Sequence, residues 1–158
     1  MRCVVQRVLE SSVEVGGKQV SEIGEGLNVL VGVGNDDGDK DCEYIADKLV
    51  NLRIFEDSEG KTNLSMPDIA AAGRPCGILL ISQFTLMGDV RHGKRPSFTD
   101  AAAPSDAESI YMKLVRRVEE LCAPHGIKVG RGVFRADMKV KIVNDGPFTI
   151  LLDSKKSF

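Results

Sequence analysis

A glycine–proline corner near the end of the chain restricts its fold strongly: Asn144-Asp145-Gly146-Pro147-Phe148-Thr149. Before it, Lys139–Val143 alternates polar and apolar residues, and Phe148–Leu152 after it resembles a second strand. Proline cannot donate to a sheet ladder, and glycine followed by proline gives access to unusual φ angles and to a cis bond. The stretch predicts a short rigid corner with carbonyl oxygens left over from strand pairing. Taken alone, it also fits a plain turn that closes a two-stranded ribbon.

Composition limits the classes of protein that fit. A chain of 158 residues is most simply one domain, and its net charge of −2 argues against a general nucleic-acid coat, although a local patch can still recognise an RNA end. The four cysteines form no CxxC or Cys/His cluster, so we expect free thiols, no metal site and no cofactor. We see no signal peptide and no membrane span, which predicts a cytoplasmic protein.

The periodicity predicts one α+β domain over residues 1–153, a largely antiparallel sheet or open barrel covered by two helices. Residues 154–158 resemble a loose tail. The expected elements are a first strand (Met1–Val8), a hairpin with a two-glycine turn (Val13–Val20), a buried central strand (Leu27–Val33), a helix over Lys40–Leu52 capped by Asp39, and a second helix opened by a capping box of Ser105 and Glu108.

Arg7 lies on the same face of the first strand as Cys3 and Val5, and a guanidinium on an apolar face needs partners. Two interpretations are open. Either the strand has already reached the rim of the sheet at this position, or Arg7 binds carbonyl oxygens. The Gly146-Pro147 corner is expected to have carbonyl oxygens that are not used in strand pairing.

A very hydrophobic strand, Gly77–Ile81, continues into Ser82-Gln83-Phe84-Thr85-Leu86. A core strand that turns polar at its end often presents chemistry on a rigid base. Strand alternation would place Ser82 and Phe84 on one face and Gln83 and Thr85 on the other. Backbone amides would therefore have to do part of the work in any single site.

The remaining polar residues give weaker signals. Arg91, Lys94 and Arg95 form a basic loop that is either solvated or binds phosphate. Neither His92 nor His125 has a recognisable serine or cysteine partner, so a hydrolase triad is not supported. A site of hydroxyls and backbone N–H groups still catalyses by positioning and oxyanion stabilisation, provided that the substrate supplies its own nucleophile.

Four stretches together resemble the D-aminoacyl-tRNA deacylases: Met1–Val8, Ser82–Leu86, Arg95-Pro96-Ser97-Phe98 and Asn144–Thr149. The resemblance runs from residue 1 to about 152. It implies a homodimer that hydrolyses the ester between a D-amino acid and the 3′ end of tRNA and also clears mischarged glycine. It further implies a cis Gly146-Pro147 bond in a corner that enters the partner's site, where its carbonyls hold the α-centre and reject L-amino acids.

The same resemblance assigns roles to residues. Ser82, Gln83, Phe84 and Thr85 form the catalytic strand, with the Phe84 N–H as oxyanion donor and Thr85 as an orienting group or a nucleophile. The ribose 2′-hydroxyl activates or performs the attack, and Arg7 fixes the corner through its carbonyls. One departure is Arg135, where the family usually has glycine. Two rival functions stay open, a non-catalytic RNA-end binder and a general esterase with a Thr85 or Ser82 nucleophile.

Overall fold

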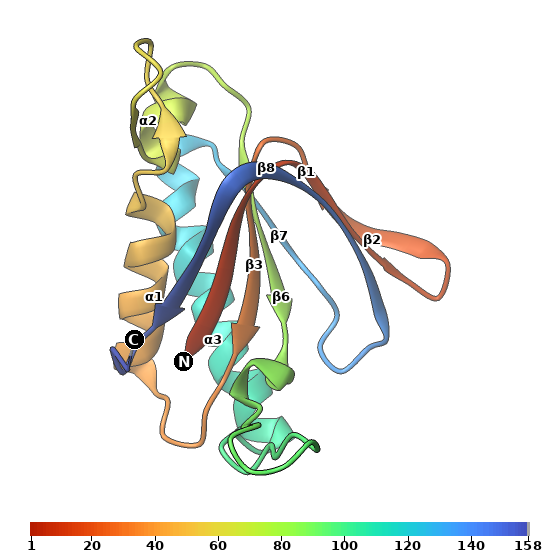
Figure 1. The fold of residues 1–158 in the computed structure, drawn as a ribbon. Helices are drawn as coiled ribbons and strands as arrows, with labels where there is room; N and C mark the ends of the chain where they lie inside the picture. The colour runs from red at the N-terminus through yellow and green to blue at the C-terminus, as the bar shows by residue number, and fades with distance from the viewer. Residues whose placement is uncertain (158) are drawn as a thin grey trace.

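The structure is a computed structural model that describes residues 1–157. One curled sheet carries two long helices on one side (Figure 1). The strands are β1 (Arg2–Val15), β2 (Lys18–Ile23), β3 (Gly26–Gly32), β4 (Phe55–Glu56), β5 (Thr62–Leu64), β6 (Gly77–Ser82), β7 (Lys128–Arg131) and β8 (Met138–Asp153). The helices are α1 (Asp39–Asn51), α2 (Met66–Ala71) and α3 (Pro104–Cys122), with 3-10 turns η1 (Phe84–Met87) and η2 (Ala123–His125).

The long strand β1 connects the parts of the sheet. Its first half pairs antiparallel with β3, its second half with β2, and β8 runs antiparallel along nearly all of it. On the other side of β3, the pairs β3–β6 and β6–β7 are parallel. Strands β3 and β6 are almost continuously apolar because the sheet is covered on both faces at this point. The expected α+β class and single domain are confirmed.

Two apolar clusters hold the sheet. Helices α1 and α3 pack on one face through stripes spaced three and four residues apart, which include Ile45 and Leu49 of α1 and Leu114 and Val118 of α3. A smaller cluster fills the concave side of the curl: Val8, Val13, Ile23, Leu79 and Ile81. At Gly77 and Gly130 the backbone approaches β2 so closely that a Cβ would have no space, which nearly closes the sheet into a barrel.

Both long helices begin differently from the prediction. Helix α1 starts at Asp39, and its N-cap is Gly38, whose N–H donates to the Asp41 carboxylate at 2.9 Å. Helix α3 starts one residue before the predicted capping box, at Pro104, and Ala103 is its N-cap. Proline at the first helical position has the φ angle that a helix requires and lacks only an N–H that would have no partner there.

The corner lies within a single strand and does not join two. Residues before and after it both belong to β8, which excludes the turn that would close a two-stranded ribbon. The register against β1 passes from Gln6 opposite Thr149 to Val8 opposite Asn144, so the residues between them form a bulge. The Gly146-Pro147 bond is cis, and the φ of Gly146 lies outside the left-handed region.

The segment after β8 is tied to the body of the protein over residues 154–157, in contrast to the expected loose tail. The Ser154 N–H donates to the Met1 carbonyl at 2.9 Å, and Lys155 lies 3.0 Å from Asp41 and 3.5 Å from Asp37. Phe158, the last residue of the predicted tail, lies outside the described residues.

Candidate active site

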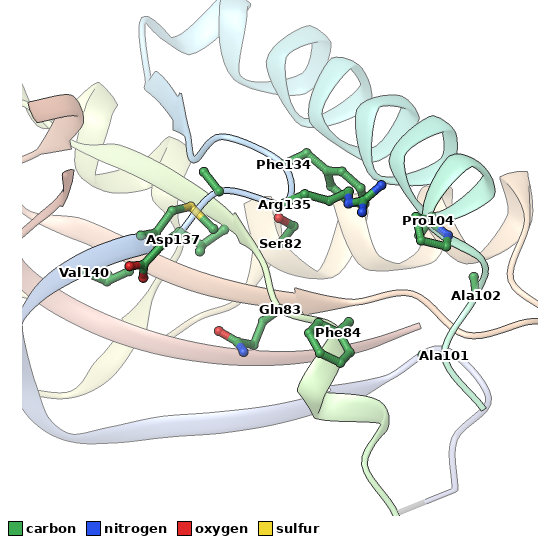
Figure 2. A pocket seen from close by; sticks show the side chains of 14 residues that line it. Ser82, Gln83, Phe84, Ala101, Ala102, Pro104, Phe134, Arg135, Asp137 and Val140 are labelled. Atoms are coloured by element: carbon green, nitrogen blue, oxygen red, sulfur yellow. The ribbon is translucent and has the colours of Figure 1, made fainter. Parts of the chain in front are cut away.

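A cavity of about 510 Å³ opens where β6 ends, between this end and the segment that leads from β7 to β8 (Figure 2). Two of its walls come from segments far apart in sequence. Its lining consists of Ile81, Ser82, Gln83, Phe84, Ala101, Ala102, Pro104, Ala107, Phe134, Arg135, Ala136, Asp137, Met138 and Val140. Three of the four predicted catalytic residues, Ser82, Gln83 and Phe84, therefore meet in one cavity.

The chain turns sharply at the end of β6, and this turn brings the three residues together. Strand β6 ends at Ser82 and does not continue to Leu86 as the sequence predicted. The Gln83 N–H donates to the Val31 carbonyl at 2.7 Å, and the chain then forms η1. We call Ser82–Met87 the site turn. Since a 3-10 turn breaks the strand alternation, neighbouring side chains line the same cavity.

The site turn also supplies backbone donors. The N–H groups of Phe84 and Thr85 belong to the first turn of η1, and the first amides of a helix have no carbonyl acceptor within it. The Phe84 ring is 59% exposed and packs edge-on against Phe98, with ring centroids 5.1 Å apart. This contact packs the site turn against the segment that follows the basic loop.

Thr85, the fourth predicted catalytic residue, does not line the cavity. Its side chain is exposed, and its Oγ1 accepts a hydrogen bond from the Gln83 side-chain amide. Within one chain, Thr85 therefore orients Gln83. Over residues 1–157, no histidine or carboxylate is hydrogen-bonded to this hydroxyl.

The opposite wall escaped the sequence prediction because its residues carry no recognisable motif. It comes from the β7–β8 segment and the start of α3 and includes Phe134, Asp137 and Met138. Buried Tyr111 supports both walls: its hydroxyl donates to the Leu80 carbonyl at 2.9 Å, and its ring lies 6.0 Å from that of Phe134. The only sequence signal for this wall was Arg135, which stands where the family usually has glycine and which lies in the wall.

The charges in the cavity are few. Arg135 and Asp137 are the charged residues of its lining, and both are exposed. Neither His92 nor His125 contributes to it. Burial raises the pKa of the Tyr111 hydroxyl, so this phenol stays neutral and acts as a donor at neutral pH. Apart from its two charged residues, the lining is mainly apolar, with the hydroxyl of Ser82 and the side-chain amide of Gln83 as its polar side-chain groups.

The Gly146-Pro147 corner does not line the cavity of its own chain, and both of its residues are exposed. Arg7 is 5% exposed and holds the base of the corner. Its guanidinium lies 4.3 Å from the centre of the Phe148 ring. Its Nε lies 2.7 Å from Asp145 Oδ2, an ion pair whose N–H direction is too poor for a hydrogen bond.

Arg7 also donates from Nη1 to the Ile54 carbonyl at 2.6 Å. The prediction that it binds the carbonyls of Gly146 and Pro147 is therefore corrected: within the described chain it fixes the residues on either side of them. Its burial also rules out the alternative in which it lies at the open rim of the sheet.

The predicted basic loop is closed by two hydrogen bonds of 2.8 Å between the backbones of Asp89 and Ser97. Arg91 is paired with Asp89, and the two guanidinium contacts are 2.7 and 2.9 Å long. Hydrogen bonds from Arg91 lower the pKa of Asp89 to about 2, so the pair stays ionised at neutral pH. Lys94 and Arg95 are exposed, and they are the cations of the loop that remain available.

Two further findings concern ligands and membranes. Over residues 1–157, no group of three or more histidine, cysteine, aspartate or glutamate side chains has a geometry that would hold a metal ion. Within the same residues, no helix combines the length and the apolar character needed to cross a bilayer.

Comparison with known proteins gives a consistent result. The family model described as D-Tyr-tRNA(Tyr) deacylase matches residues 4–153. A D-aminoacyl-tRNA deacylase of Natranaerobius thermophilus is 52% identical, and one of Thermoanaerobacter pseudethanolicus is 53% identical, each over the full length of both chains.

Solved structures show the same fold. The c-Myc DNA Unwinding Element Binding Protein superimposes with a TM-score of 0.87 at 40% identity, covering 97% of this chain and 98% of that one. A protein described as a probable eukaryotic D-amino acid tRNA deacylase has a TM-score of 0.77 at 18% identity, covering 96% and 97%. The match over nearly the whole sequence, together with a cavity built around the Ser82–Phe84 turn, shows that this chain belongs to the D-aminoacyl-tRNA deacylase family.

Proposed function

We propose that the cavity at the site turn hydrolyses the ester that joins a D-amino acid, or mischarged glycine, to the terminal adenosine of tRNA. One observation carries this proposal: the first amides of η1 lie beside a cavity in which neither histidine takes part. Such a site suits a substrate that brings its own hydroxyl next to the ester. The terminal ribose of aminoacyl-tRNA does this.

In the proposed reaction, water attacks the ester carbonyl and the bond from this carbon to the ribose 3′ oxygen breaks. The negative charge that develops on the carbonyl oxygen is stabilised by the Phe84 N–H. The ribose 2′-hydroxyl hydrogen-bonds the attacking water and assists its deprotonation, and a proton passes to the departing 3′ oxygen. Thr85 orients Gln83, and no covalent acyl-enzyme forms. The products are a free D-amino acid and tRNA.

Chiral selection is assigned to the Gly146-Pro147 corner of a second copy of the chain. The β8 bulge leaves the corner unpaired and exposed, while Arg7, Asp145 and Phe148 hold its base. A rigid main-chain wall against the α-carbon would clash with an L side chain and accept a D side chain or glycine. Leu9 of β1 and Leu151 of β8 are each 58% exposed, which supports a protein contact on these strands.

The RNA contacts are assigned to the basic loop. Its base is tied to the site turn because Phe98 packs on Phe84, and Lys94 and Arg95 are exposed on it. Arg91 contributes less, because Asp89 already binds its guanidinium. Since the proposed substrate is charged tRNA, the expected compartment is the cytoplasm and the expected role is proofreading in translation.

The test is the deacylation of one tRNA charged in parallel with D-tyrosine, L-tyrosine and glycine. We expect rapid loss of D-tyrosine and glycine while L-tyrosine stays attached. Equal cleavage of the two enantiomers would favour the general esterase. Salt-sensitive tRNA binding with no cleavage would favour the binding module.

A variant at Gly146 tests the wall directly. In Gly146→Ala the new Cβ would meet only Asn144 Nδ2, at 3.6 Å, so the chain itself has space for it. The methyl group would project from the proposed wall, and we expect D-tyrosyl-tRNA turnover to fall by about 100-fold. Gly24→Ala is the matched control, because a Cβ there meets nothing within 4 Å. Full activity of Gly146→Ala would discredit the wall.

A further inference from the structure

Arg135 occupies a backbone conformation that arginine rarely adopts. Its φ is +63°, in the left-handed region that glycine enters without steric cost. Arg135 follows Phe134 in the wall opposite the site turn, at the position where the family resemblance predicts glycine. The backbone conformation therefore does not explain why an arginine stands at position 135, whereas a role of its side chain in the cavity would explain it.

The guanidinium of Arg135 has no partner within residues 1–157: no hydrogen bond or ion pair engages it. Most arginines in the described chain do donate to a neighbour: Arg2, Arg7, Arg53, Arg74, Arg91, Arg117 and Arg131. Arg135 is exposed although it lines the cavity. Figure 2 shows its side chain extending along the wall toward Pro104. The cavity thus carries a cation whose charge-binding capacity is unused.

We infer that Arg135 binds the phosphodiester on the 5′ side of the terminal nucleotide of the substrate RNA. This inference rests on the proposed function. One ribose carries both the acylated hydroxyl and the 5′ phosphate, so the phosphate must lie within about a sugar's width of the ester. A cation in the cavity wall is within reach of it, and a guanidinium matches two phosphate oxygens with paired N–H groups.

Exposure decides between the RNA and the acyl group as the partner of Arg135. The RNA must leave the cavity toward solvent, and Arg135 lies on an exposed part of the wall. Asp137, two residues further along the same wall, could compete with a phosphate for the Arg135 guanidinium. No ion pair joins Arg135 and Asp137 in the described structure. A phosphate would therefore meet a guanidinium that is not neutralised. Arg135 acts on substrate binding and takes no part in the bond changes.

The experiment compares the chain with Arg135→Gln on two esters of D-tyrosine, one of full-length tRNA and one of plain adenosine, which has no phosphate. On the tRNA we expect KM to rise about three- to fivefold with kcat unchanged, the effect of one exposed ionic contact. The slope of log(kcat/KM) against log salt should become shallower by about 0.7. On the adenosine ester the two proteins should be equal.

Companion variants separate charge from conformation. Arg135→Lys keeps the charge and should recover most of the affinity. Arg135→Gly suits the positive φ, so it should stay folded and show the same loss as Arg135→Gln. Arg116→Gln is the matched control, because Arg116 is also exposed and lies on α3 outside this cavity. It should leave KM and the salt slope unchanged.

Other outcomes would overturn the inference. An unchanged KM on tRNA, or an equal loss on the adenosine ester, would show that Arg135 does not bind the phosphate. A loss confined to tRNA charged with D-aspartate would reassign Arg135 to an acidic acyl group. If the unaltered chain cleaves neither ester of D-tyrosine, the proposed function itself fails, which is distinguishable from a failure of the Arg135 assignment.

Discussion

Gly32→Ala should impair catalysis although the residue does not line the cavity. Gly32 ends β3 directly beneath the site turn. A Cβ there would lie 2.9 Å from Leu86 Cβ and 3.1 Å from the Gln83 carbonyl oxygen. Carbon atoms in ordinary contact are about 3.5–4.0 Å apart, so the turn would have to move by up to about 1 Å. Both atoms are close to the backbone, so no flexible side chain can absorb this displacement.

The displacement sets the expected magnitudes. Inserting a methyl group into a packed site costs about 1–3 kcal/mol of stability. A shift of about 1 Å at a catalytic group can reduce the rate by about 100-fold. Since the Phe84 N–H moves with the turn, we expect kcat on D-tyrosyl-tRNA to fall by about 10- to 100-fold in a protein that is still folded. Single-turnover deacylation and thermal unfolding measure the two effects separately.

Gly34→Ala provides the control. Its Cβ would approach Met87 Cε at 2.8 Å, but this atom is the end of a flexible side chain, and the next contacts are at 3.5 Å. We expect kcat within about threefold of the unaltered chain, because the methionine rotates away and the turn keeps its place. Equal kcat values for the two variants, with both folded, would refute the argument that β3 sets the position of the Phe84 N–H, the proposed oxyanion donor.

Two further predictions concern a hydroxyl and a carboxylate. Thr85→Ala removes the hydrogen bond from Gln83, and kcat should fall by about tenfold at most; a loss of about 10⁴-fold in a folded protein would make Thr85 the nucleophile. Burial raises the pKa of Asp41, but hydrogen bonds from Ser154, the Gly38 N–H and Lys155 lower it more, to about 2. This stabilisation is present above about pH 4 and is lost as the pH falls toward 2. Urea unfolding should therefore show Asp41→Asn less stable by about 1–2 kcal/mol at pH 6 and nearly equal at pH 2, whereas a constant difference would contradict this assignment.

The elements with strong local signals were predictable. The apolar run of β3, the alternation of β1 and the helical spacing of α1 each specify an element through contacts within a few residues. The turn Gly16-Gly17 also formed as predicted, because both glycines adopt a positive φ, which their lack of a Cβ permits. The predicted first residues of α1 and α3 were less accurate. Gly38 and Pro104 favour a helix start through their backbone geometry, whereas the prediction relied on side-chain caps.

Part of the predicted catalytic stretch comes together in one cavity, and the shape of the chain there differs from the prediction. Ser82, Gln83 and Phe84 line the cavity, but the strand was expected to continue where the chain instead forms η1. That turn depends on the hydrogen bond from Gln83 to Val31 and on the absence of a side chain at Gly32. Val31 and Gly32 both lie at the end of β3, about fifty residues earlier in the chain. The sequence pattern within Ser82–Leu86 carries no signal for these long-range contacts, so it could not predict the turn.

By itself the sequence determined which residues are apolar, where the backbone is restricted, and which motifs mark the family. The Gly146-Pro147 corner is rigid because of its own covalent structure, so it was visible without coordinates. Only the tertiary structure decided that the corner is a bulge within β8, that Arg7 holds it through Asp145 and Phe148, and that Arg135 lines the same cavity as the site turn. These facts depend on which distant strands pair, and that pairing is set by the burial of the whole sheet rather than by any local stretch.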